Sequence, residues 1–434
     1  MSVMTGAPGP TRSLTAVSAS ENPVDVLIIG GGPSGSAAAI TLARAGRRVM
    51  VVDKAAFPRD KCCGDGLTTG ALRVLEHLGL DPAAVPSWTV VDDVWLRSPS
   101  GREVQLRLPD RASSGQFSAV ARRVELDAAL LDLARKAGAE IRERNALVGI
   151  KTSPEAVECR LEDGSTVRAS FAIAADGMWS PTRKLLGLHE DGYLGEWHAF
   201  RQYLGGVTGP AASRQYVWFE PDVLPGYAWS FPLPPDADGK VFVNFGFGVP
   251  RDGRPIRDMK KTWADLLERP HIKAALGGPI EPEDRPTAWP IPARIDRAVL
   301  SYGRVLFVGD AAGATDIMTG EGIGQALLTG QLAGEAIAGT AAGAGTRRVT
   351  EAYRASVRHH LFADHRMSVA LGRVLRYRWG ARGAIRVVAL TPWTRRNFVR
   401  WMFEDEPRAV IVTPKRWHRG FLRRKGAYVA ASGS

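Results

Sequence analysis

The sequence of 434 residues is poor in cysteine and has no long uninterrupted hydrophobic run. Its three cysteines, two of them adjacent, exclude a disulfide framework and favour a reducing compartment. Acidic residues interrupt the most apolar long stretch, residues 305–346, inside any window of about 20 residues, so no transmembrane helix is predicted. Residues 1–22 lack the basic start and the apolar core of a signal peptide and are predicted to be a disordered leader.

Histidine and cysteine occur in no spacing that is typical of a metal site, so no metal is expected. Acidic residues are too few to balance the basic ones, and the net charge of +12 by itself favours an anionic partner such as nucleic acid or a lipid surface. The excess is local, because residues 351–434 hold 18 Lys and Arg residues and 5 Asp and Glu residues. With 45% hydrophobic residues, the chain can form a large core in about two or three domains.

Residues 24–53 have the pattern of a strand, a glycine-rich turn, a helix and a second strand. The apolar run at 24–29 leads into a glycine-rich turn, a helix is predicted over 36–45, and the run at 48–52 ends at Asp53. This context turns a weak glycine motif into a strong prediction of a dinucleotide site. Asp53 stands where an acidic side chain accepts hydrogen bonds from a ribose.

The residues of the turn are expected to have different roles. Gly30 permits the tight turn, Gly32 lets the backbone approach a pyrophosphate, and Gly35 lets the helix pack closely on the strand. The helix N-terminus, at Pro33 and Ser34, is expected to face the phosphates. Two later apolar strands end in Asp176-Gly177 and in Gly309-Asp310, at the sheet edge where ligands of open α/β sheets bind.

Together these motifs, in this order, resemble the FAD-binding framework of the flavoprotein superfamily that contains para-hydroxybenzoate hydroxylase, flavin-dependent halogenases and geranylgeranyl reductases. Residues 57–67, the Arg123-x-x-Leu-Asp element, residues 224–232 and residues 319–323 are similar to the geranylgeranyl reductase branch, and especially to actinobacterial menaquinone-type reductases.

The resemblance implies that FAD is the cofactor. It also implies that further residues, besides the glycine turn and Asp53, bind FAD. These are Lys54, Cys63, Gly64, Arg123, Asp176, Gly177, Gly309, Asp310, Gly320, Gly322 and Ile323. A long helix is expected to follow residues 320–324 and to run to about residue 338, with its N-terminus at the flavin. Asp316 departs from the family pattern and is expected to bring a carboxylate close to the flavin.

A predicted strand at 227–231 places Tyr227, Trp229 and Phe231 on one face, with a hairpin partner at 241–249. Periodicity alone favours an ordinary sheet core, and it is the resemblance that makes these residues the lining of an isoprenoid cavity above the flavin. The neighbouring Cys62-Cys63 pair follows Arg59 and Lys61, whose charge would lower the pKa of an exposed thiol.

By resemblance, the protein is a reductase that hydrogenates C=C bonds of an isoprenoid chain with hydride from flavin N5. Tyr227 and Cys63 are hypotheses for the proton donor, and the electron donor is open. The alternative is an NAD(P)H-dependent flavin monooxygenase, a hydroxylase in natural-product tailoring. No nucleic-acid partner is expected.

The sequence thus predicts an α/β fold: a Rossmann-like FAD-binding domain with an inserted antiparallel substrate sheet and a helical C-terminal extension. The expected segments, after the leader at 1–22, are the first FAD part at 23–184, the substrate sheet at 185–292, the second FAD part at 293–350 and the basic extension at 351–434.

The basic extension mixes aromatic and basic side chains in a way that suits the headgroups of an anionic membrane. The residues concerned are Trp379, Trp393, Trp401, Trp417, Arg395, Arg396, Arg400, Arg416 and Arg423. An ordinary solvated face is an equally good interpretation of this stretch by itself. The expected location is therefore the cytoplasm, with peripheral docking on the inner face of the cell membrane as the finer hypothesis.

Overall fold

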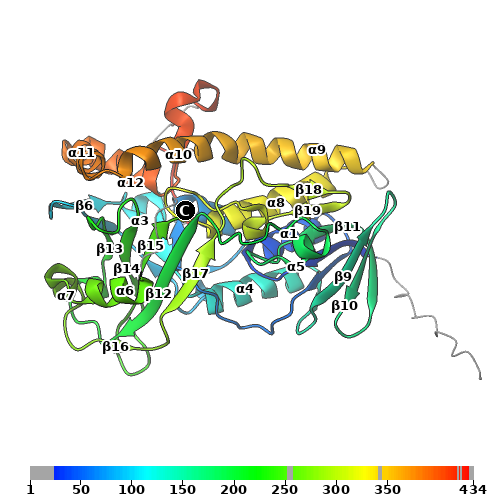
Figure 1. The fold of residues 1–434 in the computed structure, drawn as a ribbon, viewed down its shortest axis with the longest axis horizontal. Coiled ribbons are helices and arrows are strands. Elements are labelled where there is room, and N and C mark those ends of the chain that lie inside the picture. Colours follow the sequence, from blue (N-terminus) through cyan, green and yellow to red (C-terminus); the bar gives the residue numbers. More distant parts are fainter. Residues whose placement is uncertain (1–23, 252–257, 341–344, 418–419, 421–422, 430–434) are drawn as a thin grey trace, which may run out of the picture.

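The computed structural model describes residues 24–251, 258–340, 345–417, 420 and 423–429. A sheet with covering helices lies on the right of Figure 1, a second sheet lies on the left, and the C-terminal helices run across the top of both. The predicted leader at 1–22 lies outside the described residues.

The first sheet carries the predicted dinucleotide motif. Its strands are β1 (Val24–Ile29), β2 (Val49–Val52), β8 (Glu140–Arg142), β9 (Leu147–Thr152), β10 (Val157–Leu161), β11 (Thr166–Ala174), β18 (Ser301–Tyr302) and β19 (Val305–Phe307). The order is β18-β19-β11-β1-β2-β8, with parallel pairing from β19 to β8, and β9 and β10 add an antiparallel ribbon to β11. The residues of β2 and the second half of β1 are all buried, as expected for parallel strands that are covered on both faces.

Helices cover this sheet, and α1 and α5 follow the carboxyl ends of β1 and β11. The covering helices are α1 (Pro33–Arg44), α2 (Thr69–His77), α4 (Arg123–Lys136), α5 (Pro181–Leu185), α8 (Ile323–Ala338) and α9 (Thr346–Val357). The short α3 (Arg111–Ser114) lies on the left of Figure 1, with the second sheet. A side chain at Gly330 would place its Cβ 2.0 Å from the Ser34 carbonyl oxygen, so α8 crosses α1 at backbone contact. The helix expected up to about residue 338 ends at Ala338.

The second sheet holds the predicted hairpin. Its strands are β5 (Asp93–Arg97), β6 (Glu103–Arg107), β12 (Trp197–Gly205), β13 (Gln215–Trp218), β14 (Tyr227–Leu233), β15 (Phe242–Pro250), β16 (Glu281–Pro282) and β17 (Thr287–Ile291). The order is β16-β12-β15-β14-β13-β5-β6, with β17 beside β12. The antiparallel pairing of β14 with β15 confirms the predicted hairpin. Helices α6 (Met259–Leu267) and α7 (Pro270–Leu276) pack on one face through Trp263, Leu266 and Ile272.

The second sheet also includes strands from outside the segment that was expected to form it. The sheet was expected within residues 185–292, but β5 and β6 join it from residues 93–107, and β5 pairs with β13 in parallel. When two paired strands are more than 100 residues apart in the chain, the local sequence of neither strand indicates that they pair. A third, small sheet consists of β3 (Gly66–Thr68), β7 (Ser118–Val120) and β4 (Thr89–Val90), all from the segment between β2 and β8. The division into domains stays a prediction.

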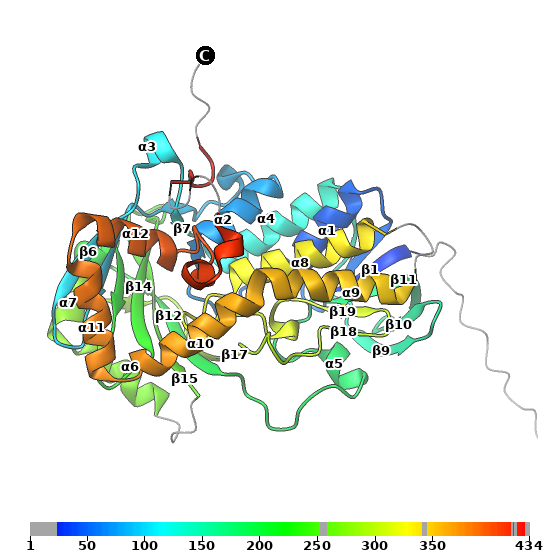
Figure 2. The ribbon, with the colours of Figure 1, turned by 90° about the horizontal axis from the view of Figure 1, so that it is seen from above.

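The C-terminal extension is helical, as predicted. A π-helical turn, η4 (Arg358–Phe362), joins α9 to α10 (Ala363–Leu375), followed by α11 (Arg378–Ala389), α12 (Pro392–Met402) and the 3-10 turn η5 (Arg408–Val412). Figure 2 shows α9 and α10 as one diagonal rod over the molecule, with α11 and α12 at its far end beside β6. Among the residues that the structure describes, no helix is long and apolar enough to cross a membrane.

Candidate active site

The predicted site residues meet in one cavity of about 800 Å³ between the two large sheets. Such a volume is within the range of about 300–1,000 Å³ that is typical of ligand pockets. Gly35 and Gly309 are outside the lining and act in packing instead. The predicted residues that do line the cavity are Gly30, Gly32, Pro33, Ser34, Asp53, Lys54, Cys63, Gly64, Arg123, Asp176, Gly177, Tyr227, Trp229, Phe231, Asp310, Gly320, Gly322 and Ile323.

The glycine turn at the start of α1 needs glycine for steric reasons. Gly30 has φ of +106°, and an added Cβ would lie 2.3 Å from the Ala175 carbonyl oxygen. A Cβ on Gly35 would lie 1.8 Å from the Gly30 carbonyl oxygen, which confirms the close packing predicted there. A Cβ on Gly32 would meet only the end of the Arg59 side chain, at 3.3 Å. The turn therefore exposes its backbone to a ligand at the N-terminus of α1.

The acidic residues at the strand ends already hold the surrounding loops. Asp53 accepts hydrogen bonds from the backbone N–H of Gly31, at 2.7 Å, and of Ala55, at 2.8 Å. Asp310 forms an ion pair with Lys61 at 2.9 Å, and this contact joins β19 to the cysteine loop. Asp176 accepts from the Thr182 N–H through one oxygen, and its Oδ1 is buried with no partner among the described residues. This oxygen is free to accept a hydrogen bond from a ligand or an ordered water.

The cysteine loop does not hold reactive thiols, contrary to the expectation for exposed cysteines. Burial raises the pKa of Cys62 to about 12 and also raises the pKa of Cys63. The expected basic neighbours are occupied elsewhere, since Arg59 pairs with Asp127 and Lys61 with Asp310. Both thiols are therefore protonated at neutral pH.

Arg123 and Asp127 form a buried pair on α4. The guanidinium donates two hydrogen bonds of 2.7 Å to the two carboxylate oxygens, and Arg59 donates a third at 2.9 Å. Neither Arg123 nor Asp127 is more than 5% exposed. This geometry fixes the loop that carries Cys63 and leaves the edge of Arg123 in the cavity lining.

Asp65, two residues after Cys63, is a site residue that the sequence motifs did not assign. Its Oδ2 accepts hydrogen bonds from the Tyr203 hydroxyl at 2.6 Å and from Asn244 Nδ2 at 2.8 Å, while Oδ1 is buried without a partner among the described residues. Its backbone has the rare left-handed conformation, with φ of 63°. Burial raises the pKa of Asp65 to about 6. The one sequence signal that could have identified Asp65 as a site residue is its position in the Cys-Gly-Asp-Gly run.

Replacement of Asp65 by Asn should change how stability depends on pH. The unfolded carboxyl ionises near pH 3.8, whereas the folded one has a pKa of about 6, so the free energy of unfolding falls as pH rises through this interval. We expect Asp65→Asn to flatten that fall in urea titrations.

The control is Asp163→Asn. Asp163 is exposed, and hydrogen bonds from Ser165 lower its pKa, so its small contribution grows with pH instead. An unchanged slope in Asp65→Asn would contradict the assignment of a buried, proton-holding carboxyl to Asp65.

The aromatic wall forms as predicted from strand periodicity. The ring of Trp229 lies between Tyr227, at a centroid distance of 5.9 Å, and Phe231, at 6.2 Å. Trp229 Nε1 donates to Asn244 Oδ1 at 3.0 Å, which fixes the indole. The Tyr227 hydroxyl donates to the Thr319 carbonyl oxygen, and burial raises the pKa of this phenol far above its usual value. This wall therefore holds the loop at 319–322 in place.

Asp316 was expected to bring a carboxylate close to the flavin, but it is not among the residues that line the cavity. Its side chain turns away from the cavity and accepts hydrogen bonds from Ser368 and from the Thr319 hydroxyl and N–H, each at 2.8 Å. Arg408 lies 3.3 Å away and helps to lower the pKa of Asp316. The carboxylate thus anchors the loop to the C-terminal extension.

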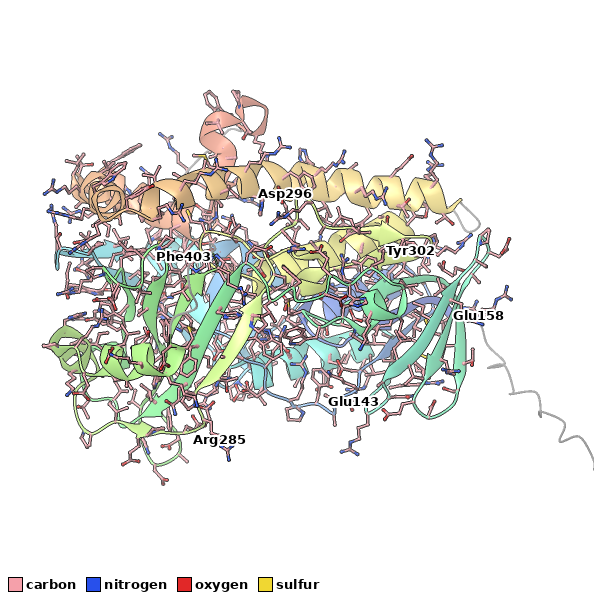
Figure 3. All side chains as sticks on the ribbon, in the orientation of Figure 1. Glu143, Glu158, Arg285, Asp296, Tyr302 and Phe403 are labelled. Carbon is pink, nitrogen blue, oxygen red and sulfur yellow. The ribbon has the colours of Figure 1, made fainter. Side chains whose placement is uncertain are left out.

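The C-terminal extension contributes to the cavity itself. Leu371, Ile385, Val388 and Trp401 are among the lining residues, and they come from α10, α11 and α12. Phe403, labelled in Figure 3, lies beneath these helices and belongs to the lining as well. Trp401 and Arg400 were predicted to face a membrane, but Trp401 donates to the Arg408 carbonyl oxygen and Arg400 is buried against Asp405. No local sequence pattern reveals which tryptophan turns inward.

The site fits FAD by its own geometry. The glycine turn offers backbone N–H groups to a pyrophosphate, and Asp176 Oδ1 is free to accept a hydrogen bond. Gly177 and Gly320 both have positive φ and no atom within 4 Å of an added Cβ, so they leave open space in the lining. The N-terminus of α8 begins beside this space, where its partial positive charge favours an anionic group.

Comparison with known proteins agrees with this geometry. A family model described as an FAD binding domain matches residues 23–364. The chain is 35% identical over 333 residues to menaquinone reductase of Mycolicibacterium smegmatis, covering 72% of this chain and 75% of that protein. It is 32% identical over 326 residues to digeranylgeranylglycerophospholipid reductase 1 of Methanopyrus kandleri, covering 72% and 79%.

The fold has a solved counterpart. A geranylgeranyl bacteriochlorophyll reductase-like protein from Thermoplasma acidophilum superposes with a TM-score of 0.72 at 20% identity, covering 91% of this chain and 99% of that one. The sequence and fold comparisons both confirm the resemblance that the motifs indicated. The chain belongs to the geranylgeranyl reductase family of FAD-dependent oxidoreductases, within the para-hydroxybenzoate hydroxylase-like superfamily.

Proposed function

We propose that the protein reduces C=C bonds of an isoprenoid chain, of the geranylgeranyl or menaquinone type. The observation that carries this proposal is the continuity of the cavity, which runs from the glycine turn past the aromatic wall to apolar side chains of α10, α11 and α12. A small polar substrate needs no such apolar extension, whereas a prenyl chain fills it. The relatives named as reductases of menaquinone and of a digeranylgeranyl lipid support the same substrate class.

Within this function the protein positions and shields the substrate. Bound FAD, when reduced, supplies two electrons and a hydrogen from N5. The glycine turn, Asp53 and Arg123 would hold the cofactor, while Trp229 and Phe231 would hold the chain against it. An isolated alkene develops no strong oxyanion, so alignment and exclusion of water account for most of the protein's contribution. Tyr227 and Cys63 stay predictions as proton donors, to be tested by Tyr227→Phe and Cys63→Ala.

Oxygen dependence separates this function from flavin monooxygenation. In a single turnover without oxygen, a prenyl lipid should reoxidise the reduced flavin, and when oxygen is admitted no oxygen atom should enter the product. Stoichiometric oxygen uptake into the product would overturn the reductase and establish the hydroxylase instead.

A mobility assay tests whether nucleic acid is a partner. The protein should not retard a DNA duplex at low salt.

We further propose that α11 and the start of α12 dock on an anionic membrane. Trp379 is 69% exposed, Leu390 70% and Trp393 61%, and arginines at positions 378, 382 and 386 are exposed beside them. Val387 is 59% exposed and also lines the cavity, so the cavity reaches this surface. A lipid substrate could then enter from the bilayer without crossing water.

Vesicle binding tests the docking surface. We expect Trp379→Ser combined with Trp393→Ser to weaken sedimentation with anionic vesicles by about 10-fold or more, because two interfacial indoles are lost. The matched control is Tyr302→Ser, a 45% exposed aromatic on β18 that Figure 3 shows away from α11. Equal binding of the double variant and the control, or wild-type binding that ignores lipid charge and salt, would contradict the docking surface.

A further inference from the structure

Three carboxyl groups at the loop 319–322 lie near a single buried guanidinium, which belongs to Arg408. Arg408 lies 3.3 Å from Asp316 Oδ2 and 3.2 Å from Glu404 Oε1, and its side chain is 2% exposed. The third carboxyl belongs to Glu321, which makes no ion pair within the described part of the chain. Asp316 is buried and Glu321 and Glu404 are partly buried, so one positive charge does not compensate three negative charges here and the cluster retains a proton at neutral pH.

Glu321 is the member of the cluster that faces the substrate space. It lines the cavity together with Tyr227 and Cys63, whereas Asp316, Glu404 and Arg408 are outside the lining. Its Oε1 accepts a hydrogen bond of 2.8 Å from the Gly324 N–H at the start of α8. Its Oε2 has no hydrogen-bond partner among the described residues, which leaves this oxygen available to a ligand.

The hydrogen bonds favour a proton on Glu321 over one on Glu404, because Glu321 has one donor and Glu404 has three, one of them the Arg408 guanidinium. Burial, and then the neighbouring Glu404, raise the pKa of Glu321 to about 8, while Arg408 and the Gly324 N–H oppose that rise and Asp316 adds to it. The pKa of Glu404 is also raised by burial, but Arg408, Gln325 and Thr68 contact its oxygens. Asp316 is the ionised partner of Arg408, because its pKa is lowered.

Tyr227, Cys63 and Asp65 are less suited to proton transfer than Glu321. The Tyr227 hydroxyl is committed to the Thr319 carbonyl oxygen, and its pKa and that of the Cys63 thiol are raised. Asp65, with a pKa of about 6, is mostly ionised at neutral pH and its free oxygen is buried. A general acid works best when its pKa is near the operating pH, which Glu321 satisfies.

We propose that Glu321 is the general acid that delivers a proton to the alkene, and that Glu404 of the C-terminal extension is a positioning residue that keeps this proton in place. The inference rests on the proposed function. In the step, the C=C π bond breaks, one new C–H bond takes the hydrogen and electron pair from the reduced flavin, and the other takes the proton from Glu321. The O–H bond of Glu321 breaks, and the resulting carboxylate regains a proton from solvent.

Glu321→Gln tests the assignment with little change in shape. The matched control is Glu335→Gln on the same helix, whose side chain is exposed. After photoreduction without oxygen, we expect single-turnover reoxidation by a prenyl lipid to slow by about 100-fold or more in Glu321→Gln and to be unchanged in Glu335→Gln. Glu321→Asp should recover part of the rate. A Glu321→Gln rate within about threefold of wild type would overturn the proposal.

A second measurement is independent of turnover. In the substrate-free protein at neutral pH, infrared spectra should show the carbonyl band of a buried protonated carboxyl, and Glu321→Gln should remove it. Retention of the full band would show that another group holds the proton. If the wild-type enzyme reduces no prenyl lipid while the band behaves as expected, the proposed function fails and the protonated Glu321 is retained.

Glu404→Gln tests the positioning role through the pH profile. Because the charge of Glu404 helps to raise the pKa of Glu321, its removal should lower that pKa, and the rate should decline at lower pH than in the wild type. Asp316, Arg408, Tyr227 and Cys63 are the other charged or titratable groups around Glu321, and they are unchanged in this variant. A merely structural role would lower the rate equally at all pH values and would overturn the positioning role.

Discussion

Replacement of Asp127 by Asn should destabilise the protein by about 3–5 kcal/mol, because it leaves a buried guanidinium without its counter-ion. Asp127 is fully buried and accepts three hydrogen bonds, two from Arg123 and one from Arg59. An amide is nearly isosteric, but it carries no charge and its nitrogen cannot accept. The change therefore removes the electrostatic compensation of Arg123 and leaves the packing of α4 intact.

Urea denaturation, followed by the intrinsic fluorescence of the tryptophans, measures this loss. The matched control is Asp132→Asn on the same helix, whose carboxylate is 59% exposed in its pair with Arg135. Exposed pairs of this kind contribute at most about 1 kcal/mol, so the control should unfold almost as the wild type does. Similar losses in the two variants would contradict the account of the buried pair.

Replacement of Gly35 by Ala should prevent FAD binding and destabilise the fold by about 3 kcal/mol or more, at the upper end of over-packing penalties. The new Cβ would lie 1.8 Å from the Gly30 carbonyl oxygen and 3.2 Å from the Ala175 side chain. The nearest atom belongs to the backbone, so α1 has to move away from β1. That movement displaces the N-terminus that is proposed to face the pyrophosphate.

Thermal unfolding and flavin titration of the apoprotein measure the two effects. Gly383→Ala is the control, because Gly383 lies inside α11 and an added Cβ meets no atom within 4 Å. Alanine there reduces the freedom of the unfolded chain and should be neutral or slightly stabilising. Wild-type flavin affinity in Gly35→Ala would contradict the role of the glycine turn.

Sequence patterns were sufficient for the FAD-binding half of the molecule because its determinants are local. Gly30, Gly35 and Asp53 lie within one strand-turn-helix-strand unit, and each carries a steric or hydrogen-bonding requirement that a short motif records. The aromatic wall was predictable for the same reason, since a period of two assigns Tyr227, Trp229 and Phe231 to one face.

The missed features depend on contacts between distant segments. Glu404 and Arg408 reach the loop at 319–322 from the C-terminal extension, and Asp65 meets Tyr203 and Asn244 across more than 100 residues. The basic extension was correctly predicted to be helical, but its periodicity could not show that Trp401 turns toward the cavity while Trp393 stays exposed. Tertiary packing decides such orientations.

The mass of the product tests the central claim most directly. The photoreduced, flavin-loaded enzyme would be incubated with prenyl lipids in the absence of oxygen, and the lipids would be analysed by mass spectrometry. Reduction predicts a product that gains two hydrogen atoms for each flavin reoxidised. Lipids that return unchanged without oxygen, and that gain an oxygen atom when it is admitted, would contradict the account.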